Sequence, residues 1–335
     1  MSSHPLLEYH PARASARFYR SHLPGEGHPA PQLGVREKEH PLLACAGAFY
    51  QWIACSWDRY SNPPPGKFVE VHGLRMYLYC IGQGSPTVVL DSGLSDTWLD
   101  WYKVQPETAR FTRVCAYDRA GVGWSDPRLG PRTSRVIAEE LHTLLHNAGV
   151  APPFVLAGHS MGGLNVRMYA SLYRAEVAGM VLVDSCHPDQ PRRIPGFEAS
   201  SEHRRREIER DRVLMPFGIP RLLGWCGSWY GSRVAGRQVA LRSFDCTVRQ
   251  KRGTLAEMAG SNNSFDEARA TGSLGDIPLI VVSEAPSSAG AKRFLAFWYP
   301  MQDELARLSS RGSRVNPQGS GLPMISRALP LVMAR

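Results

Sequence analysis

The chain has 335 residues, of which 43% are apolar and 21% charged. This composition excludes a chain that is disordered throughout, and the length suffices for one large α/β domain with an insertion. Its formal charge of +9 comes from 39 basic residues against 30 acidic ones. The basic residues are scattered, and no patch interleaves them with aromatic residues, which argues against nucleic acid as a partner.

Residues 1–65 precede the expected domain. Residues 1–40 lack an apolar period and end in a charged cluster, so we expect a tail without fixed structure. Residues 41–57 are uncharged and include Trp52 and Trp57, but the run is short of the ~20 residues that span a bilayer. It is interpreted as a membrane anchor or as a helix packed on the domain, since a secretory signal would stand nearer the chain start. A Pro-rich linker follows.

Short apolar runs then predict strands. Two of them flank a turn at His72-Gly73 and predict an antiparallel hairpin, and the next two predict buried strands. These four runs are 68–71, 74–79, 87–90 and 114–117.

The loops after the two buried strands have different expected roles. After residue 90, Gly93 lets the chain turn so that the Leu94 N–H can face a substrate carbonyl. After residue 117, we interpret the glycine-rich loop as structural, with Asp118 and Arg119 forming an internal ion pair. A helix is predicted over 134–148, where the glycine that follows ends it.

The segment Gly158-His159-Ser160-Met161-Gly162 stands between an apolar run and a helical pattern. A G-x-S-x-G sequence in a strand–turn–helix setting is typical of a nucleophile elbow, which lifts the serine oxygen clear of the sheet. A side chain at Gly158 or Gly162 would collide with neighbouring elements in so tight a turn. Ser160 is therefore predicted to be a nucleophile.

The alternation of strands and helices stops after a strand predicted over 180–185 and resumes at residue 277. Residues 186–275 are therefore predicted to be an insertion that covers the Ser160 end of the sheet as a lid. Two interpretations of its aromatic residues stay open: they line an acyl pocket, or they only pack the lid together. These residues are Trp225, Trp229 and Tyr230.

The last part of the chain predicts a strand over 277–282, a helix broken at Pro300, and a short strand at residues 314–316. From Leu322 the sequence carries two prolines where a closing helix is expected, so that helix should be short or displaced.

The seven cysteines show no C-x-x-C pair and no zinc-ligand spacing, so neither a metal centre nor a disulfide framework is predicted. We interpret them as small buried apolar side chains of a reducing compartment. His142 and His146 lie one helical turn apart, but without a third ligand a solvated stripe is preferred to a metal pair. No cofactor is expected.

Five motifs together resemble the α/β-hydrolase fold family over roughly residues 66–321. They are Ser-Gly-Leu at 92–94, Tyr-Asp-Arg-Ala-Gly-Val-Gly-Trp-Ser-Asp at 117–126, Gly-His-Ser-Met-Gly-Gly at 158–163, Val-Leu-Val-Asp-Ser at 181–185 and Pro-Leu-Ile-Val-Val at 278–282. The resemblance implies a mostly parallel eight-stranded sheet with helices on both faces, in a domain over 66–335 that includes the lid. It also implies hydrolysis of an ester-like bond of a small molecule through a serine acyl-enzyme.

Carried over by position, Ser160 is the nucleophile, and the N–H groups of Leu94 and Met161 are the oxyanion donors. The acid is expected at Glu284, with Asp184 as the alternate. Similar sequences carry the catalytic histidine after a Gly-Ser-Gly that here precedes Leu322, so the usual base is absent. His187 is the one downstream substitute near the carboxyl edge of the sheet.

Because a serine without its base is a weak nucleophile, the sequence predicts a carboxylesterase-like hydrolase with an incomplete triad. The alternative is a non-catalytic hydrolase-fold protein that binds a small hydrophobic ligand. Dehalogenase or epoxide hydrolase chemistry on this fold would require an aspartate at position 160. The expected location is the cytoplasm or a membrane to which residues 41–57 attach the chain.

Overall fold

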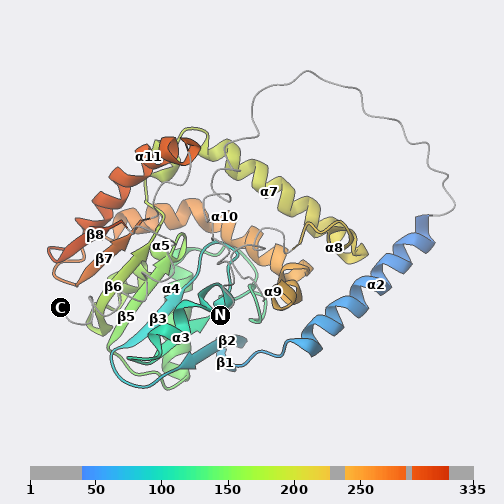
Figure 1. Ribbon diagram of the computed structural model, residues 1–335, viewed down its shortest axis with the longest axis horizontal. Helices are drawn as coiled ribbons and strands as arrows, with labels where there is room; N and C mark the ends of the chain where they lie inside the picture. Colours follow the sequence, from blue (N-terminus) through green and yellow to red (C-terminus); the bar gives the residue numbers. More distant parts are fainter. Residues whose placement is uncertain (1–39, 227–237, 284–288, 317–335) are drawn as a thin grey trace, which may run out of the picture.

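The computed structural model describes residues 40–226, 238–283 and 289–316, and Figure 1 shows their arrangement. An eight-stranded sheet lies at the centre, in the order β1-β2-β4-β3-β5-β6-β7-β8. The strands are β1 (Lys67–Val71), β2 (Leu74–Ile81), β3 (Thr87–Asp91), β4 (Val114–Tyr117), β5 (Phe154–His159), β6 (Val177–Val183), β7 (Leu279–Val282) and β8 (Gly312–Val315).

β2 pairs antiparallel with both β1 and β4, and every other neighbouring pair is parallel. The predicted fold class is thereby confirmed. The β1–β2 hairpin is also present, with positive φ at both His72 (52°) and Gly73 (79°), as a two-residue turn between twisted strands requires. The short strand predicted near residue 314 is β8.

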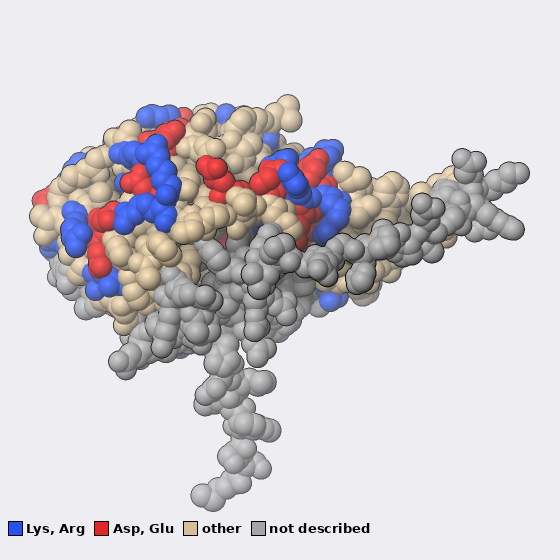
Figure 2. Space-filling view, turned by 90° about the horizontal axis from the view of Figure 1, so that it is seen from above, with Lys and Arg blue, Asp and Glu red and all other residues tan. Residues whose placement is uncertain are grey.

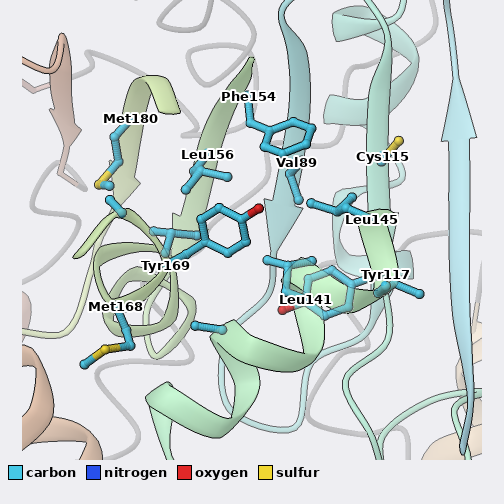
Figure 3. Close-up of a cluster of buried hydrophobic side chains, with 14 of the residues drawn as sticks. Val89, Cys115, Tyr117, Leu141, Leu145, Phe154, Leu156, Met168, Tyr169 and Met180 are labelled. Carbon is cyan, nitrogen blue, oxygen red and sulfur yellow. The ribbon is translucent and has the colours of Figure 1, made fainter. Parts of the chain in front are cut away.

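Helices cover both faces of the sheet. α4 (Ser134–Asn147) and α5 (Gly162–Leu172) pack on one face, and η1 (Trp98–Trp101) with α3 (Val104–Thr108) packs on the other. Alternate residues of one strand reach opposite faces, as Val89 joins the first core and Val88 the second. Figure 3 shows the first core, in which the ring of Tyr169 of α5 points toward the ring of Phe154 of β5 and meets it edge-on.

Between β6 and β7 the described chain is helical. Its helices are α6 (Gln190–Arg193), α7 (Phe197–Leu214), η3 (Met215–Phe217), α8 (Ile219–Leu222), α9 (Gln238–Asp245) and α10 (Val248–Ala270). The short η2 (Arg174–Glu176) lies just before β6. In Figure 1, α10 crosses the end of the sheet at which α5 begins.

α11 (Ala289–Ala306) corrects one expectation, because it continues through Pro300 instead of breaking there. Its residues on either side of the proline are held by tertiary packing, since Trp298 and Met301 are buried in one cluster with Ile194. Packing of this kind can outweigh the local cost of ~3 kcal/mol for a proline inside a helix.

Two disulfides contradict the expectation that the cysteines are unpaired. Cys80 of β2 lies directly opposite Cys115 of β4 in the antiparallel register and is bonded to it. Cys226 is bonded to Cys246. Cysteines opposite one another on paired strands are close enough to bond, but this pairing depends on strand register rather than on spacing in the sequence.

Residues 41–57 lie within a single helix, α2 (His40–Ser61), which packs against η3 and α9. None of the described helices combines the length and the apolarity that crossing a membrane requires.

Candidate active site

Ser160 lies in the turn between β5 and α5 at the carboxyl edge of the sheet. Its φ is +51°, a left-handed value that non-glycine residues rarely adopt and that is concentrated at functional sites. A Cβ on Gly158 would lie 2.5 Å from the Gly162 oxygen, and one on Gly162 would lie 2.3 Å from the Asp91 oxygen. The glycines are therefore needed for close approach, which is the reason predicted for them.

The loop after β3 lies beside Ser160. A Cβ placed on Gly93 would be 3.3 Å from the Ser160 Cβ and 3.0 Å from Nδ1 of His159, so no side chain separates this loop from the turn. Within the described part of the chain, the N–H groups of Leu94 and Met161 donate no hydrogen bond. Two unpaired backbone donors beside a serine fit the geometry of an oxyanion hole.

Cys186, in the loop after β6, contacts the serine hydroxyl. Its Sγ lies 3.7 Å from Ser160 Oγ, and burial raises the pKa of the thiol to about 11. Cys186 also packs with Met161 and with Phe265 of α10. The serine therefore faces a neutral thiol rather than a base in this structure.

A family model described as the alpha/beta hydrolase fold matches residues 86–198. The solved structures to which the chain is similar include a putative α/β hydrolase from Nostoc sp. PCC 7120 (TM-score 0.64, 17% identity, covering 81% of this chain and 98% of that one). They also include a thermophilic esterase from Thermogutta terrifontis (TM-score 0.55, 23% identity, covering 80% and 94%). The chain therefore has the α/β-hydrolase fold.

Curated relatives add sequence similarity but little about activity. An uncharacterised protein of Schizosaccharomyces pombe is 28% identical over 249 residues, which are 73% of this chain and 44% of that protein. An AB hydrolase superfamily protein of Gibberella zeae is 38% identical over 104 residues, which are 30% of this chain and 32% of that protein. The chain thus spans less than half the length of these relatives.

The predicted acids of this hydrolase fold are only partly described. Glu284 lies outside the described residues. Asp184 follows β6 with a φ of +40°, and its Oδ1 accepts a hydrogen bond of 3.2 Å from the indole N–H of Trp298. Its assignment as the alternate acid stays a prediction.

His187 is buried, and its ring nitrogens contact Asp189 and Glu304 rather than Ser160. Its Nδ1 accepts a hydrogen bond from the Asp189 N–H, and its Nε2 lies 3.3 Å from Oε2 of Glu304. These partners assign the proton to Nε2 and occupy the lone pair on Nδ1. A base needs a free lone pair, so His187 must release Asp189 before it can take the serine proton, and its role as substitute base stays a prediction.

Burial lowers the pKa of His187 to about 4, although Glu304 and Asp189 oppose this shift. The unfolded chain, with an ordinary histidine pKa near 6.5, binds more protons than the folded chain between pH 6.5 and 4. The quantity compared is the free energy of unfolding of wild type minus that of His187→Gln. We expect this difference to be constant above pH 6.5 and to fall by about 2 to 3 kcal/mol as the pH is lowered to 4. Urea denaturation at a series of pH values measures this difference.

The control is His203→Gln, on the outer helix α7, where the side chain is 55% exposed. It shows what the same exchange does at an exposed position. A pH-independent difference for His187→Gln would contradict the lowered pKa.

Arg119 was predicted to pair with Asp118, and the structure corrects this. Arg119 instead donates from Nη1 to Asp91 Oδ1 at 2.8 Å and from Nε to Glu257 Oε1 at 2.6 Å, and all three side chains are buried. Asp118 accepts the backbone N–H groups of Trp98 and Trp124, and burial raises its pKa to about 7.

The same guanidinium also holds the loop beside Ser160. Nη1 donates to the Ser92 oxygen at 2.7 Å and Nη2 to the Gly93 oxygen at 2.6 Å. The sequence contains no signal for Glu257, which lies on α10, but Asp91 at the end of a buried strand could have suggested a buried cationic partner. Arg119 is thus a positioning residue for this loop.

α10 fixes the next residue of the loop as well. Ser95 has a φ of +67°; its N–H donates to Glu257 and its carbonyl accepts from Gln250 at 2.7 Å. Gly253 of α10 approaches Gly121 so closely that a Cβ on it would lie 2.1 Å from the Gly121 oxygen. α10 is therefore tied to the loops after both β3 and β4.

The remaining predicted residues take structural positions or are not described. His142 stacks on Tyr173 at 3.9 Å between ring centroids and contacts Glu176, and the described chain contains no group of three or more potential metal ligands. Arg210 lies over the ring of Trp225 at 4.4 Å from its centroid. Trp229 and Tyr230 lie outside the described residues.

Proposed function

We propose that the protein hydrolyses ester-like bonds of a small substrate through an acyl-enzyme on Ser160, at a rate limited by an incomplete catalytic base. The observation that carries the proposal is the left-handed Ser160 beside two unpaired backbone N–H groups. The esterase and lactonase folds to which the chain is similar support the reaction class.

In the proposed reaction, Ser160 Oγ attacks the ester carbonyl carbon, and its proton passes to a water molecule that then protonates the leaving alcohol oxygen. The N–H groups of Leu94 and Met161 hold the resulting oxyanion, and such donors are worth about 10²- to 10³-fold each. The C–O bond to the alcohol then breaks, and the alcohol leaves with a proton. Water attacks the acyl-enzyme, releases the acid and returns the proton to Ser160.

The contacts of His187 and Cys186 support a slow reaction. His187 has its Nδ1 lone pair occupied by the Asp189 N–H, and the Cys186 thiol is neutral at ordinary pH because its pKa is raised. Neither group accepts a proton readily. Without a base, the oxyanion donors and substrate binding supply the remaining catalysis, which is ~10³- to 10⁴-fold over water in serine proteases.

We further propose that the helices over residues 186–275 form the cover of this site. Phe265 of α10 packs with Met161 and Leu94, the two residues assigned as oxyanion donors. A substrate held at Ser160 would therefore be shielded from water by α10.

Labelling with an alkyl fluorophosphonate tests the nucleophile independently of turnover. Ser160 Oγ would displace fluoride and form a phosphonate ester, so intact-mass measurement should show one adduct on wild type and none on Ser160→Ala. Ser200→Ala, on the outer helix α7, is the matched control and should label like wild type.

Two results would contradict the proposal. An adduct retained by Ser160→Ala would place the reactive group elsewhere. Absence of labelling and of turnover, together with saturable binding of a small hydrophobic ester, would favour the alternative of a non-catalytic ligand-binding protein.

A further inference from the structure

Helix α2 exposes large apolar side chains along one side. The outer face of α2 comprises Leu42, Phe49, Trp52, Ile53, Trp57 and Tyr60, which the 3.6-residue period places together. Each of them is exposed, Trp52 by 66% and Trp57 by 65%. Contiguous exposed apolar side chains on a protein surface mark sites that contact another protein or a membrane.

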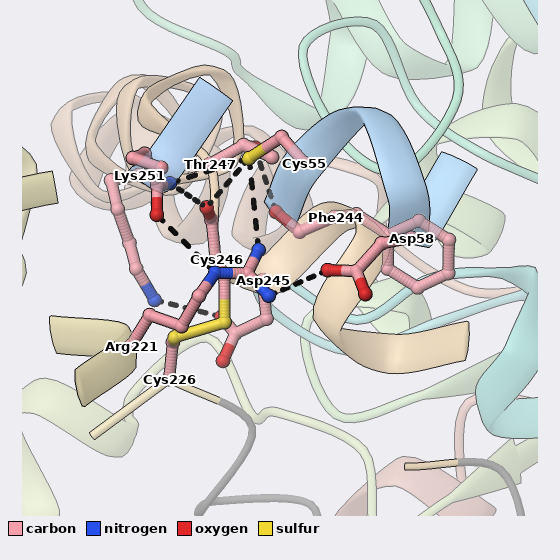
Figure 4. Close-up of a disulfide and its surroundings, with 10 residues drawn as sticks. Cys55, Asp58, Arg221, Cys226, Phe244, Asp245, Cys246, Thr247 and Lys251 are labelled. Carbon is pink, nitrogen blue, oxygen red and sulfur yellow. Dashed lines mark hydrogen bonds and ion pairs between the residues drawn. A yellow bond between two sulfur atoms is a disulfide. The ribbon is translucent and has the colours of Figure 1, made fainter. Parts of the chain in front are cut away.

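The opposite side of α2 is polar and holds the helix on the domain, as Figure 4 shows in part. Gln51 donates from Nε2 to the Cys246 oxygen at 2.7 Å, and Asp58 pairs with Arg221 at 2.6 Å with both side chains about nine-tenths buried. A Cβ on Gly47 would lie 2.4 Å from the Phe217 oxygen, so the helix approaches η3 closely.

The polarity of α2 is therefore the reverse of an ordinary surface helix, which buries its apolar face and exposes its polar one. The polar contacts of Gln51 and Asp58 fix which face points outward. Exposed apolar side chains continue beside Arg221, at Leu222 and Leu223 of the neighbouring turn.

We propose that the outer face of α2 docks on an anionic lipid surface, with the helix lying in the interface and not crossing it. Tryptophan and tyrosine are the residues enriched at lipid–water interfaces, because their rings are apolar with one polar atom. A helix held at Gly47, Gln51 and Asp58 against the domain presents its side, not its end, to the membrane.

Charge complementarity favours lipid over a second protein. Asp58 is neutralised by Arg221, so Arg59 is the charged group that α2 presents to solvent among its described side chains, and the outer face carries no carboxylate. In Figure 2, acidic and basic atoms gather together over the body, and none is seen on the tan end toward which α2 projects. A cation beside an apolar, aromatic face fits anionic headgroups above acyl chains.

Flotation of the full-length chain with vesicles tests the proposal. The vesicles are phosphatidylcholine, with or without one third phosphatidylserine. Wild type should float with vesicles, more with the anionic ones, and Phe49→Gln/Trp52→Gln/Trp57→Gln should lose at least tenfold in partitioning. Arg59→Gln should lose about fivefold of binding to the anionic vesicles only.

Leu129→Gln/Phe111→Gln is the matched control, because both side chains are exposed and large but lie outside α2. It should partition like wild type, and equal melting temperatures of all variants show that folding is intact. The proposal is overturned if wild type does not float, or if the α2 variant floats as well as wild type. It is also overturned if the α2 variant changes only a dimer into a monomer, which would assign the face to a second copy of the chain.

Discussion

Introducing a histidine at position 322 is expected to raise the rate of ester hydrolysis by about 10²- to 10⁴-fold, the range that a positioned general base contributes. The Gly-Ser-Gly at 319–321 precedes the position at which similar sequences carry the catalytic histidine. Leu322 lies outside the described residues, so this expectation rests on sequence position: an imidazole there would supply the base that the proposed reaction lacks. Steady-state kcat/KM on p-nitrophenyl acetate and butyrate measures the gain.

Leu322→Gln is the matched control, since it is polar but cannot act as a base, and it should leave the rate unchanged. Ser160→Ala combined with Leu322→His should remove the gain, because the histidine works through the serine. If wild type already turns over esters at ordinary enzyme rates of about 1 to 10³ s⁻¹ and His187→Ala does not slow it, the proposed defect does not exist.

Replacing Arg119 with methionine is expected to lower the free energy of unfolding by about 3 to 5 kcal/mol, because Asp91 and Glu257 would each be left as an uncompensated buried carboxylate. Arg119→Lys keeps the charge but lacks the guanidinium fork that reaches both carboxylates and two carbonyls. Its free energy of unfolding should therefore lie between those of Arg119→Met and wild type. Urea denaturation measures the loss.

Arg110→Met is the control, since Arg110 is 74% exposed and pairs with Glu107 on the surface. Such pairs contribute ~0 to 1 kcal/mol. If Arg119→Met costs no more than Arg110→Met, the buried ion pairs are not what holds the loop beside Ser160.

Elements defined by local pattern were predictable from sequence. Three such features follow from local backbone geometry, and each is present. They are the placement of Val88 and Val89 on opposite faces of the sheet, the glycines at the Ser160 turn and the two-residue turn at His72. The mostly parallel eight-stranded sheet was implied by the resemblance of five motifs to the α/β-hydrolase fold family, and the observed sheet has that arrangement.

Pairings between distant segments were not predictable. Asp118 and Arg119 are neighbours in sequence, yet adjacent side chains at a strand end point to opposite sides, so each finds a partner elsewhere. Glu257 is 138 residues from Arg119, and the Cys80–Cys115 bond requires the β2–β4 register. The continuous α11 likewise depends on distant residues, since the packing of Trp298 against Ile194 outweighs the local cost of Pro300.

The ties between α10 and the loop at Ser95 bear on how a substrate reaches Ser160. Lifting α10 would separate Glu257 from Arg119, which would keep only Asp91 as its buried partner, and breaking a buried ion pair costs far more than moving a surface helix. We therefore expect α10 to be a fixed wall of the proposed site. We expect substrate to enter through segments of the insertion that form no buried ion pair with the loop after β3. Movement of those segments would then leave the proposed oxyanion donor at Leu94 in place.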